Sequence, residues 1–596
     1  MSERKGRHNI GSDPELLKNE ALVQQCFKQW QMKDSSLAFY VEDHYKTYWC
    51  VVDELKLKQG DTIDRSAVKL TAFTKYISLA EIANFAITIL YSQVEAGTEE
   101  CIYYLEIAQS KIKKAKSAFT SKQLSGKSDF KQKVMATLSG AIYLGNTEQL
   151  NSIFLDQAPQ AKIVKTIPYI GYFSEMNAYV YGDHAIYEGK IYQKNTDDFF
   201  VLPHCYVKST FELSNFTPNT EYQNDWLCDF IVVFGDKGLV ALTYWALSLF
   251  AEQIRAKYGM FPFLEATGEA GAGKSLLIEF LWLLVGRSSY EGINPTTSTR
   301  VGRSRTLAQV SNLPVVFIEG DINDPNSPNH KQKAFSFEEL KPLFNGRSPR
   351  VKAVKDHTNI TDDEPFKGSV VISQNQKISG SEAILSRLIY LHFDRSQHNA
   401  QSREAASRLS RLSVEQVSGF LFHVLKNEQL IMDIVDQAFQ SNRDHIMALP
   451  NVKMERIGST HGLMLSGLQA LSEILPITDN TKQKVMHFID QIAIERERDL
   501  VSDHPALDQF WDVYEYFESL SKANDPYRLN HSPKDNEIAI NLNEFAAHAK
   551  INNQALEDIK LIKKLIEKSV RHPFIEVKTV RSLVTSKPMR CYVFKK

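Results

Sequence analysis

The pattern of apolar and polar positions divides the first part of the chain into stretches of different texture. Residues 16–30 carry apolar side chains at helical spacing, which predicts an amphipathic helix. Residues 85–91 and 101–107 are rich in β-branched and aromatic side chains and flank a turn-like Glu-Ala-Gly-Thr segment. Two such runs around a turn predict a β-hairpin.

Helical spacing returns at residues 130–135 and 147–155, and a second β-rich stretch follows at 169–207 with glycines where tight turns would fall. We therefore expect residues 1–215 to form an accessory N-terminal region of α/β structure.

The pattern of apolar and polar positions changes three times in the remainder of the chain. A strongly apolar run at 226–256 predicts a buried packing helix, inside a helical segment that we place at 216–260. Short apolar strands then alternate with helices through 261–400, as in a parallel α/β core. Helices dominate 401–521, and a polar loop separates a small module at 537–596. The predicted fold class is therefore multidomain α/β.

Net charge, cysteine distribution and the length of the most membrane-like run add three restrictions. Among 596 residues, 70 basic side chains are balanced by 71 acidic ones. The net charge therefore gives no indication of a polyanionic partner, and any surface that binds nucleic acid must be local. The six cysteines are scattered without a Cys-x-x-Cys pair, which argues against zinc sites and disulfides. The most membrane-like run, 239–251, is shorter than the roughly 18 residues that a span needs. We expect a cytoplasmic protein without a membrane partner.

The most specific motif lies at residues 268–275, where Gly-Glu-Ala-Gly-Ala-Gly-Lys-Ser stands between a predicted strand and a predicted helix. This is the context that a P-loop requires. Lys274 would reach the β and γ phosphates of ATP, and the Ser275 hydroxyl would hold Mg²⁺. The backbone of the whole loop would wrap the phosphates, through Gly268, Glu269, Ala270, Gly271, Ala272, Gly273, Lys274 and Ser275.

Two later strands end in polar residues that suit the same chemistry. An apolar strand at 313–318 runs into Glu319 and Asp321, which we assign as the Mg²⁺-side acid and the base that orients water, with their order open. The alternative is a strand that simply enters an acidic loop. The strand at 368–374 ends at Asn375, a candidate sensor of the γ phosphate.

Arg387 follows Asn375 by twelve positions and precedes another strand. An arginine finger contributes ~10³ to 10⁵ in rate, whereas a surface ion pair contributes at most about 1 kcal/mol. Both roles stay open for Arg387 on the sequence alone.

The C-terminal module reads as helix, helix and two strands, an order that fits a winged helix. It carries a local cationic excess, which suggests a contact with duplex or origin DNA. The alternatives are a solubilising surface and a subunit contact. The basic residues are Lys560, Lys563, Lys564, Lys568, Arg571, Lys578, Arg581, Lys587, Arg590, Lys595 and Lys596.

The order of P-loop, acidic strand and strand ending in asparagine resembles the superfamily 3 helicases of small viruses and mobile elements. Residues 171–394 look most like the helicase part of primase-helicases encoded by phage satellites and prophages. The resemblance implies an AAA+-like P-loop NTPase core with a helical collar, a homo-hexameric ring and translocation on single-stranded DNA. It also implies that Lys352, Lys355 and His357 lie on a DNA-binding hairpin, and that Arg387 acts across a subunit interface.

Two departures from that family restrict the prediction. Relatives often carry a zinc ribbon and a Toprim primase domain, whereas this N-terminal region has no cysteine cluster and no Toprim acidic pattern, so priming would fall to a separate primase. The second acidic motif reads Glu-Gly-Asp instead of two adjacent acids.

We expect an ATP-dependent replicative DNA helicase that uses ATP and Mg²⁺. The alternatives are a P-loop ATPase of phage defence or DNA remodelling, and a replication initiator that uses ATP as an assembly switch.

Overall fold

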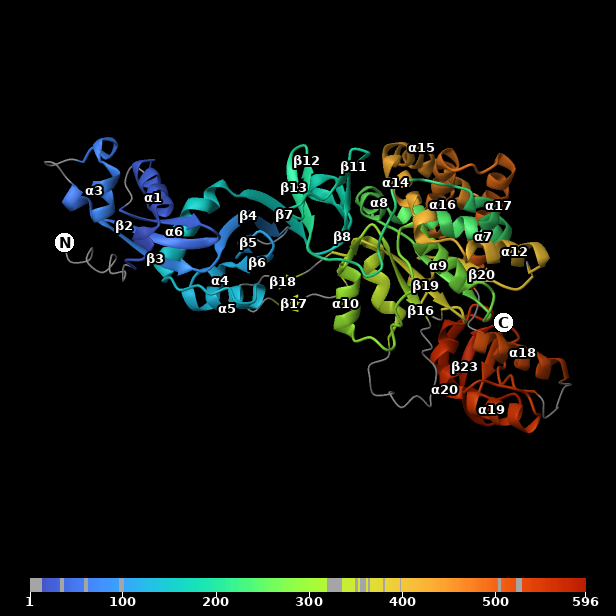
Figure 1. Cartoon of the computed structure of the whole chain (residues 1–596). Helices are drawn as coiled ribbons and strands as arrows, with labels where there is room; N and C mark the ends of the chain where they lie inside the picture. The colour runs from blue at the N-terminus through green and yellow to red at the C-terminus, as the bar shows by residue number, and fades with distance from the viewer. Residues whose placement is uncertain are drawn as a thin grey trace.

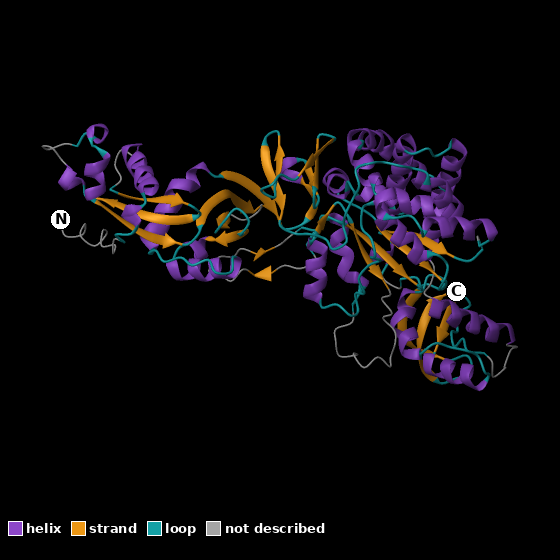
Figure 2. Ribbon diagram, in the orientation of Figure 1, coloured by secondary structure: helices purple, strands orange, loops and turns teal. Residues whose placement is uncertain are grey.

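The computed structural model describes residues 13–32, 37–57, 63–95, 101–318, 335–348, 352–353, 361–362, 365–378, 381–396, 398–501, 505–520 and 528–596. Figure 1 shows an elongated molecule in which the N-terminal strands lie at one end and the helix-rich half at the other, with the C-terminal module beside it. Strands run along the N-terminal half, and helices gather around the second half (Figure 2).

The first element group is a small helix-on-sheet unit. Helix α1 (Glu20–Met32) and helix α3 (Leu70–Lys75) pack on an antiparallel sheet of order β1-β2-β3, formed by Ala38–Asp43, Lys46–Val52 and Ile77–Ala83. Helix α1 confirms the helix predicted at 16–30, although it begins later, because residues 16–18 form a short 3₁₀ turn instead.

A larger sheet follows, with strand order β12-β13-β7-β4-β5-β6. Strands β4 and β5 form the predicted antiparallel hairpin. Leu105, Phe119 and other buried side chains on one face pack against helices α5 and α6. The bounds are β4 (Ala86–Glu95), β5 (Cys101–Ala108), β6 (Lys114–Thr120), α5 (Lys127–Thr137), α6 (Thr147–Gln157), β7 (Lys162–Ile167), β12 (Phe200–Leu202) and β13 (Cys205–Ser209).

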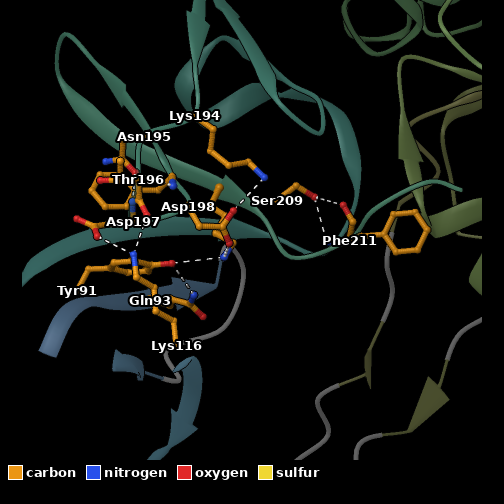
Figure 3. Close-up of polar contacts among 12 residues, drawn as sticks. Tyr91, Gln93, Lys116, Lys194, Asn195, Thr196, Asp197, Asp198, Ser209 and Phe211 are labelled. Carbon is orange, nitrogen blue, oxygen red and sulfur yellow. Dashed lines mark hydrogen bonds and ion pairs between the residues drawn. The ribbon is translucent and has the colours of Figure 1, made fainter. Parts of the chain in front are cut away.

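The other face of this sheet is covered by the chain's own loop 194–199 (Figure 3). Side chains alternate between faces along a strand, so Lys116 on β6 points away from the buried Phe119. Lys116 forms an ion pair of 3.1 Å with Asp197, and Lys208 on β13 pairs with Asp198. These pairs fasten the loop over the sheet, and the lysines of this face are engaged within the chain.

A third sheet joins the accessory region to the parallel α/β core. Its order is β11-β10-β9-β8-β15, formed by Lys190–Gln193, His184–Tyr187, Ala178–Val180, Ile170–Phe173 and Val310–Ser311. Strand β15 comes from the part of the chain that forms this core and pairs in parallel with β8. Gly171 has φ +113°, and a Cβ there would lie 1.8 Å from the carbonyl oxygen of Ser311. Only glycine permits this close pairing, which fixes the accessory region to the core.

The core itself is a parallel sheet of order β16-β19-β14-β20, formed by Pro314–Ile318, Ser369–Gln374, Phe263–Gly268 and Leu388–Phe393. Because the strands are parallel, their carboxyl ends lie at one edge of the sheet. We call this the carboxyl edge, and the opposite edge the amino edge.

Long helices pack around this sheet. Helix α7 (Trp226–Ser248) and helix α8 (Ala251–Tyr258) precede β14, as predicted for 226–256. In the described parts of the chain, α7 is the one helix long and apolar enough to cross a membrane, and 67% of its most apolar window is buried inside the protein. Helices α12 (Ala400–Leu409), α14 (Gly419–Lys426), α15 (Glu428–Met447), α16 (Glu455–Ile474) and α17 (Asp479–Val501) share one core with it.

The C-terminal module differs from its prediction in two respects. It contains a sheet of order β21-β23-β22, formed by Glu537–Ile540, Pro588–Lys595 and Phe574–Arg581, beside α19 (Leu542–Ile551) and α20 (Ile559–Leu565). A strand, β21, therefore stands before the first predicted helix, because Ile538 and Ile540 alternate into the core.

The second difference concerns α18 (Pro505–Leu520), which the prediction placed with the preceding helices up to residue 521. Trp511 of this helix donates a hydrogen bond of 2.8 Å from Nε1 to Ser569 Oγ and packs on Phe594 with ring centroids 5.0 Å apart. Helix α18 therefore shares the core of the C-terminal module.

Candidate functional site

The P-loop turns sharply between β14 and α9 (Lys274–Leu284). Gly268 has φ +145°, and a Cβ there would lie 1.9 Å from the carbonyl oxygen of Phe393 on the neighbouring strand. Gly271 and Gly273 have φ +78° and +93°, which other residues rarely adopt. The predicted strand, loop and helix are therefore present, and each of the three glycines has a backbone conformation that residues with a side chain rarely adopt.

Lys274 folds back over this loop. Its Nζ donates hydrogen bonds to the carbonyl oxygens of Gly268 at 2.5 Å and Glu269 at 3.0 Å, and to Asn375 Oδ1 at 3.3 Å. Lys274 and Asn375 are 101 positions apart in sequence. The structure therefore brings together two predicted site residues that follow different strands.

A cavity of about 390 Å³ opens at this point of the carboxyl edge. The amino end of α9 faces it, so backbone N–H groups and the positive end of the helix dipole favour an anion there. Gly268, Glu269 and Ala272 belong to the loop but do not line the cavity. Its walls are formed by Ala270, Gly271, Gly273, Lys274, Ser275, Leu276, Glu291, Ile318, Ser373, Gln374 and Asn375.

The cavity fits ATP with Mg²⁺. It combines an ammonium group, glycine-rich backbone and the Ser275 hydroxyl, which is the donor set that a P-loop offers to a triphosphate and its metal. Glu319 and Asp321 lie outside the described residues. Strand β16 ends at Ile318, which lines the cavity.

Glu291 also lines the cavity, and the sequence did not single it out. Residue Ile293 forms a parallel bridge with Phe317 of β16, so this short segment extends the core sheet by one position. The segment lacks an apolar run, and therefore no local pattern announces it. Glu291 adds an acidic residue to the lining of the cavity.

The predicted hairpin residues are only partly described. Lys352 lies in β17 (Lys352–Ala353), which pairs antiparallel with β18 (Thr361–Asp362). Lys355 and His357 lie outside the described residues. The backbone ladder supports a hairpin at this position in the chain.

Arg387 lies at the amino edge, immediately before β20. Its guanidinium donates to the carbonyl oxygen of Ala383 and lies over the ring of Phe344, 5.0 Å from the centroid. Burial lowers the pKa of Arg387, and the neighbouring Arg456 cation lowers it further. A strand of six residues spans about 20 Å, so Arg387 is too far from its own P-loop to contact a nucleotide there.

A different arginine, Arg395, lies beyond the other end of β20. Its Nη2 donates a hydrogen bond of 2.5 Å to the carbonyl oxygen of Ala270 in the P-loop. The preceding residue, Asp394, pairs with Lys237 of α7 at 3.1 Å. The sequence reasoning missed this arginine, because the Asp-Arg-Ser segment has no pattern of its own and its partner is 125 positions away.

Behind the loop, β14 carries a buried acid. Glu265 is fully buried, accepts a hydrogen bond of 2.6 Å from the backbone N–H of Ile378, and lies 3.5 Å from Arg496 of α17. Burial raises the pKa of Glu265 and lowers that of Arg496. The contact ties the P-loop strand to the segment after Asn375 and to the helices that pack on the core.

Comparison with known proteins places this architecture among helicase structures. No protein-family model and no curated protein matches the sequence significantly. The solved structure of an active helicase, SCCmec type IV Cch, matches with a TM-score of 0.55 and 15% identity, over 95% of this chain and 98% of that chain. The apo C-terminal region of NrS-1 matches with a TM-score of 0.32 and 10% identity, over 84% of this chain and 95% of that chain. JCV helicase matches with a TM-score of 0.19 and 11% identity, over 36% of this chain and 69% of that chain. The first likeness shows a shared fold, a multidomain α/β architecture with a P-loop-like core.

Proposed function

We propose that this protein is an ATP-dependent DNA helicase of the superfamily 3 type that serves the replication of a mobile genetic element. The observation that carries the proposal is the phosphate-binding cavity around Lys274, Ser275 and Asn375. It lies in a chain whose fold matches, over nearly its whole length, a structure described as an active helicase. We further propose a cytoplasmic protein that assembles as a homo-hexameric ring.

Each site residue has a role in this proposal. Lys274 binds the β and γ phosphates, and Ser275 and Glu319 hold Mg²⁺, which neutralises charge on the phosphates when bound. Asp321 orients the attacking water, and Asn375 contacts the γ phosphate. Arg387 reaches the nucleotide of the neighbouring subunit, since its own P-loop is a strand's length away.

Two surfaces would contact DNA. Lys352, Lys355 and His357 would track the phosphates of a single strand inside the ring. The β17–β18 ladder is consistent with that hairpin.

The C-terminal module would contact duplex or origin DNA. Its element order, β21, α19, α20, β22, β23, and its strand order β21-β23-β22 support a winged-helix-like interpretation. Lys560 and Lys564 on α20, and Arg581 and Arg590 on the strands, are exposed to solvent. Within this proposal, residues 261–400 are the motor, and the part of 401–521 that precedes α18 is the collar. Helix α18 joins 537–596 in the DNA-binding module.

A strand-displacement assay on forked DNA tests the proposal, with 3′ and 5′ single-stranded tails compared. We expect ATP-dependent displacement that starts from one type of tail. ATP hydrolysis without displacement on either substrate would instead favour a DNA-remodelling or defence ATPase. Slow hydrolysis with tight duplex binding would favour an ATP-switched initiator.

The hairpin is tested separately by the double variant Lys352→Ala, Lys355→Ala. Single strands release about 0.7 counterions for each phosphate that is neutralised, so losing two lysines should weaken single-strand binding and flatten its salt dependence. ATP binding should survive. An unchanged salt slope would mean that these two lysines do not contact the strand and are simply solvated.

A further inference from the structure

Two cationic side chains donate hydrogen bonds to carbonyl oxygens of the P-loop. Lys274 donates to the carbonyl oxygens of Gly268 and Glu269, and Arg395 donates to the carbonyl oxygen of the next residue, Ala270. The Arg395 guanidinium also lies 3.3 Å from the position that a Cβ on Gly271 would occupy. Ala270 and Gly271 both line the nucleotide cavity. Arg395 therefore lies beside two residues that line the cavity, against the loop that would hold the phosphates.

The backbone that carries Arg395 is held in place. The Asp394 carboxylate accepts hydrogen bonds from the backbone N–H of Ser396 at 2.7 Å and from its hydroxyl, and pairs with Lys237 Nζ at 3.1 Å. These donors lower the pKa of Asp394, so the group is ionised throughout the physiological range. The turn at 394–396 is thus fixed from both sides, while the Arg395 side chain itself is exposed.

A backbone carbonyl is a weak partner for a guanidinium. It carries only a partial charge, whereas a phosphate oxygen carries a formal charge and accepts the planar fork of arginine in bidentate geometry. A triphosphate in the cavity would present such oxygens against the same loop. Arg395 would need only side-chain rotation to exchange the Ala270 carbonyl for a phosphate, because its turn is already anchored.

We propose that Arg395 is a catalytic residue that binds the terminal phosphate of ATP held by the P-loop of its own subunit. This rests on the proposed function, in that ATP must occupy the cavity. In hydrolysis, water adds to the γ phosphorus while the bond to the β–γ bridging oxygen breaks, and ADP keeps that electron pair. The products are ADP, phosphate and a proton. Arg395 stabilises the charge that gathers on the γ oxygens as this bond breaks.

The assignment separates two arginines by subunit. Arg387 precedes β20 and Arg395 follows it, so they lie at opposite edges of the core sheet. Arg395 contacts the P-loop of its own chain. It therefore acts in cis, in contrast to the trans role proposed for Arg387.

The test compares the wild type with Arg395→Ala, Arg395→Lys and the control Arg403→Ala, which removes an exposed arginine from α12. Titration calorimetry measures binding of ADP and of the non-hydrolysable analogue AMP-PNP, and steady-state assays give kcat. We expect Arg395→Ala to bind AMP-PNP at least about tenfold more weakly, to bind ADP as the wild type does, and to lose about 10²-fold in kcat, as for one transition-state donor. Arg395→Lys should be intermediate, because the charge stays and the fork is lost.

Each other outcome has a definite meaning. Wild-type kcat and an unchanged ratio of AMP-PNP to ADP affinity in Arg395→Ala would overturn this inference and leave the ATP site standing. Equal weakening of both nucleotides would also overturn it, since Arg395 would then only shape the loop. Failure of the wild type to bind either nucleotide would overturn the proposed function together with the inference. Recovery of activity on mixing Arg395→Ala with Lys274→Ala subunits would overturn the cis assignment.

Discussion

The two edges of the parallel ATPase sheet both carry cationic side chains but surround them differently. At the carboxyl edge, Lys274 and Arg395 donate to carbonyl oxygens of a glycine-rich loop beside an open cavity. At the amino edge, Arg255 donates to the Gly368 carbonyl oxygen at 2.6 Å and lies between the rings of Phe261 and Phe366.

Arg387 shares the amino-edge environment. It lies over Phe344, and Arg456 reaches the same ring from α16 while donating to Ser386 Oγ at 2.9 Å. Burial lowers the pKa of Arg255 to about 10 and also lowers the pKa of Arg387. Aromatic rings and carbonyl groups therefore surround the amino-edge arginines within the subunit, and a trans role for Arg387 would require its side chain to leave the Phe344 ring.

The edge of the sheet therefore decides what an arginine beside a strand can do. Under the proposed function, a cation at the carboxyl edge contacts the nucleotide of its own chain. A cation at the amino edge either packs the core or must reach a neighbouring subunit. Substitutions at the two edges separate these roles by their effects on ATP hydrolysis.

Lys274→Ala should abolish ATP hydrolysis, because it removes the P-loop ammonium that faces the β and γ phosphates. The matched control is Lys367→Ala at the amino edge, where Lys367 Nζ donates to Tyr169 Oη at 2.8 Å. Its turnover should match that of the wild type. ATPase rates of the purified variants measure both. A wild-type rate in Lys274→Ala would remove the basis of the proposed function.

Arg387→Ala distinguishes a trans finger from a packing residue. A finger that stabilises transition-state charge contributes ~10³-fold or more in rate. If Arg387 is one, mixing Arg387→Ala with Lys274→Ala subunits should restore part of the activity, since some interfaces then have both groups. A packing residue would instead lose about 1 kcal/mol of stability with the Phe344 contact, and the folded variant would keep its turnover.

Two controls accompany that mixture. Assembly and subunit exchange must be verified for both variants, because Arg387 could hold the interface together. A series of mixing ratios separates a motor that needs every site from one that does not. If the motor does not need every site to be intact, mixtures that exchange subunits and still stay inactive at every ratio contradict the trans assignment.

The elements of the carboxyl edge were predictable where the chemistry is local or follows from strand direction. The glycines at 268, 271 and 273 announce the loop through their backbone freedom. Lys274 and Asn375 could be paired because parallel strands end at the same edge. Arg395 and Glu291 could not be found in this way. Arg395 contacts Ala270 of the P-loop from a short turn, and Glu291 lies in a short segment that pairs through Ile293 with Phe317 of β16.

The same limit applies to the fold. The hairpin β4–β5 consists of β-branched and aromatic runs around a turn, helix α7 is a long apolar run, and both were predicted. Helix α18 is amphipathic in either assignment, and only the contacts of Trp511 with Ser569 and Phe594 show which core it joins. Strand β21 is too short for its alternation to outweigh the helical pattern that follows.

Asn375→Ala should lower kcat by about 10²-fold, the usual cost of one polar group aimed at the reacting phosphate. ADP affinity should stay unchanged, because the side chain would contact only the terminal phosphate. The control is Asn345→Ala at the amino edge, whose Nδ2 donates to the Gly259 carbonyl oxygen. Equal effects of the two variants on kcat would contradict the contrast between the edges.

The smallest effect is expected from Lys237→Ala, which removes the ion pair that anchors Asp394 and, through it, the turn of Arg395. The two side chains are 27% and 39% exposed, and an exposed pair of this kind contributes at most about 1 kcal/mol. This corresponds to at most about a fivefold loss in kcat.

The control is Lys257→Ala, which removes the ion pair between Lys257 of helix α8 and Asp436 of helix α15. The deficit of Lys237→Ala should shrink as salt rises from 0.1 M toward 1 M, because screening weakens the same pair in the wild type. Lys257→Ala should keep wild-type turnover at every salt concentration. A loss of similar size in both variants would mean that surface lysines affect the motor in general, and that Asp394 does not position Arg395.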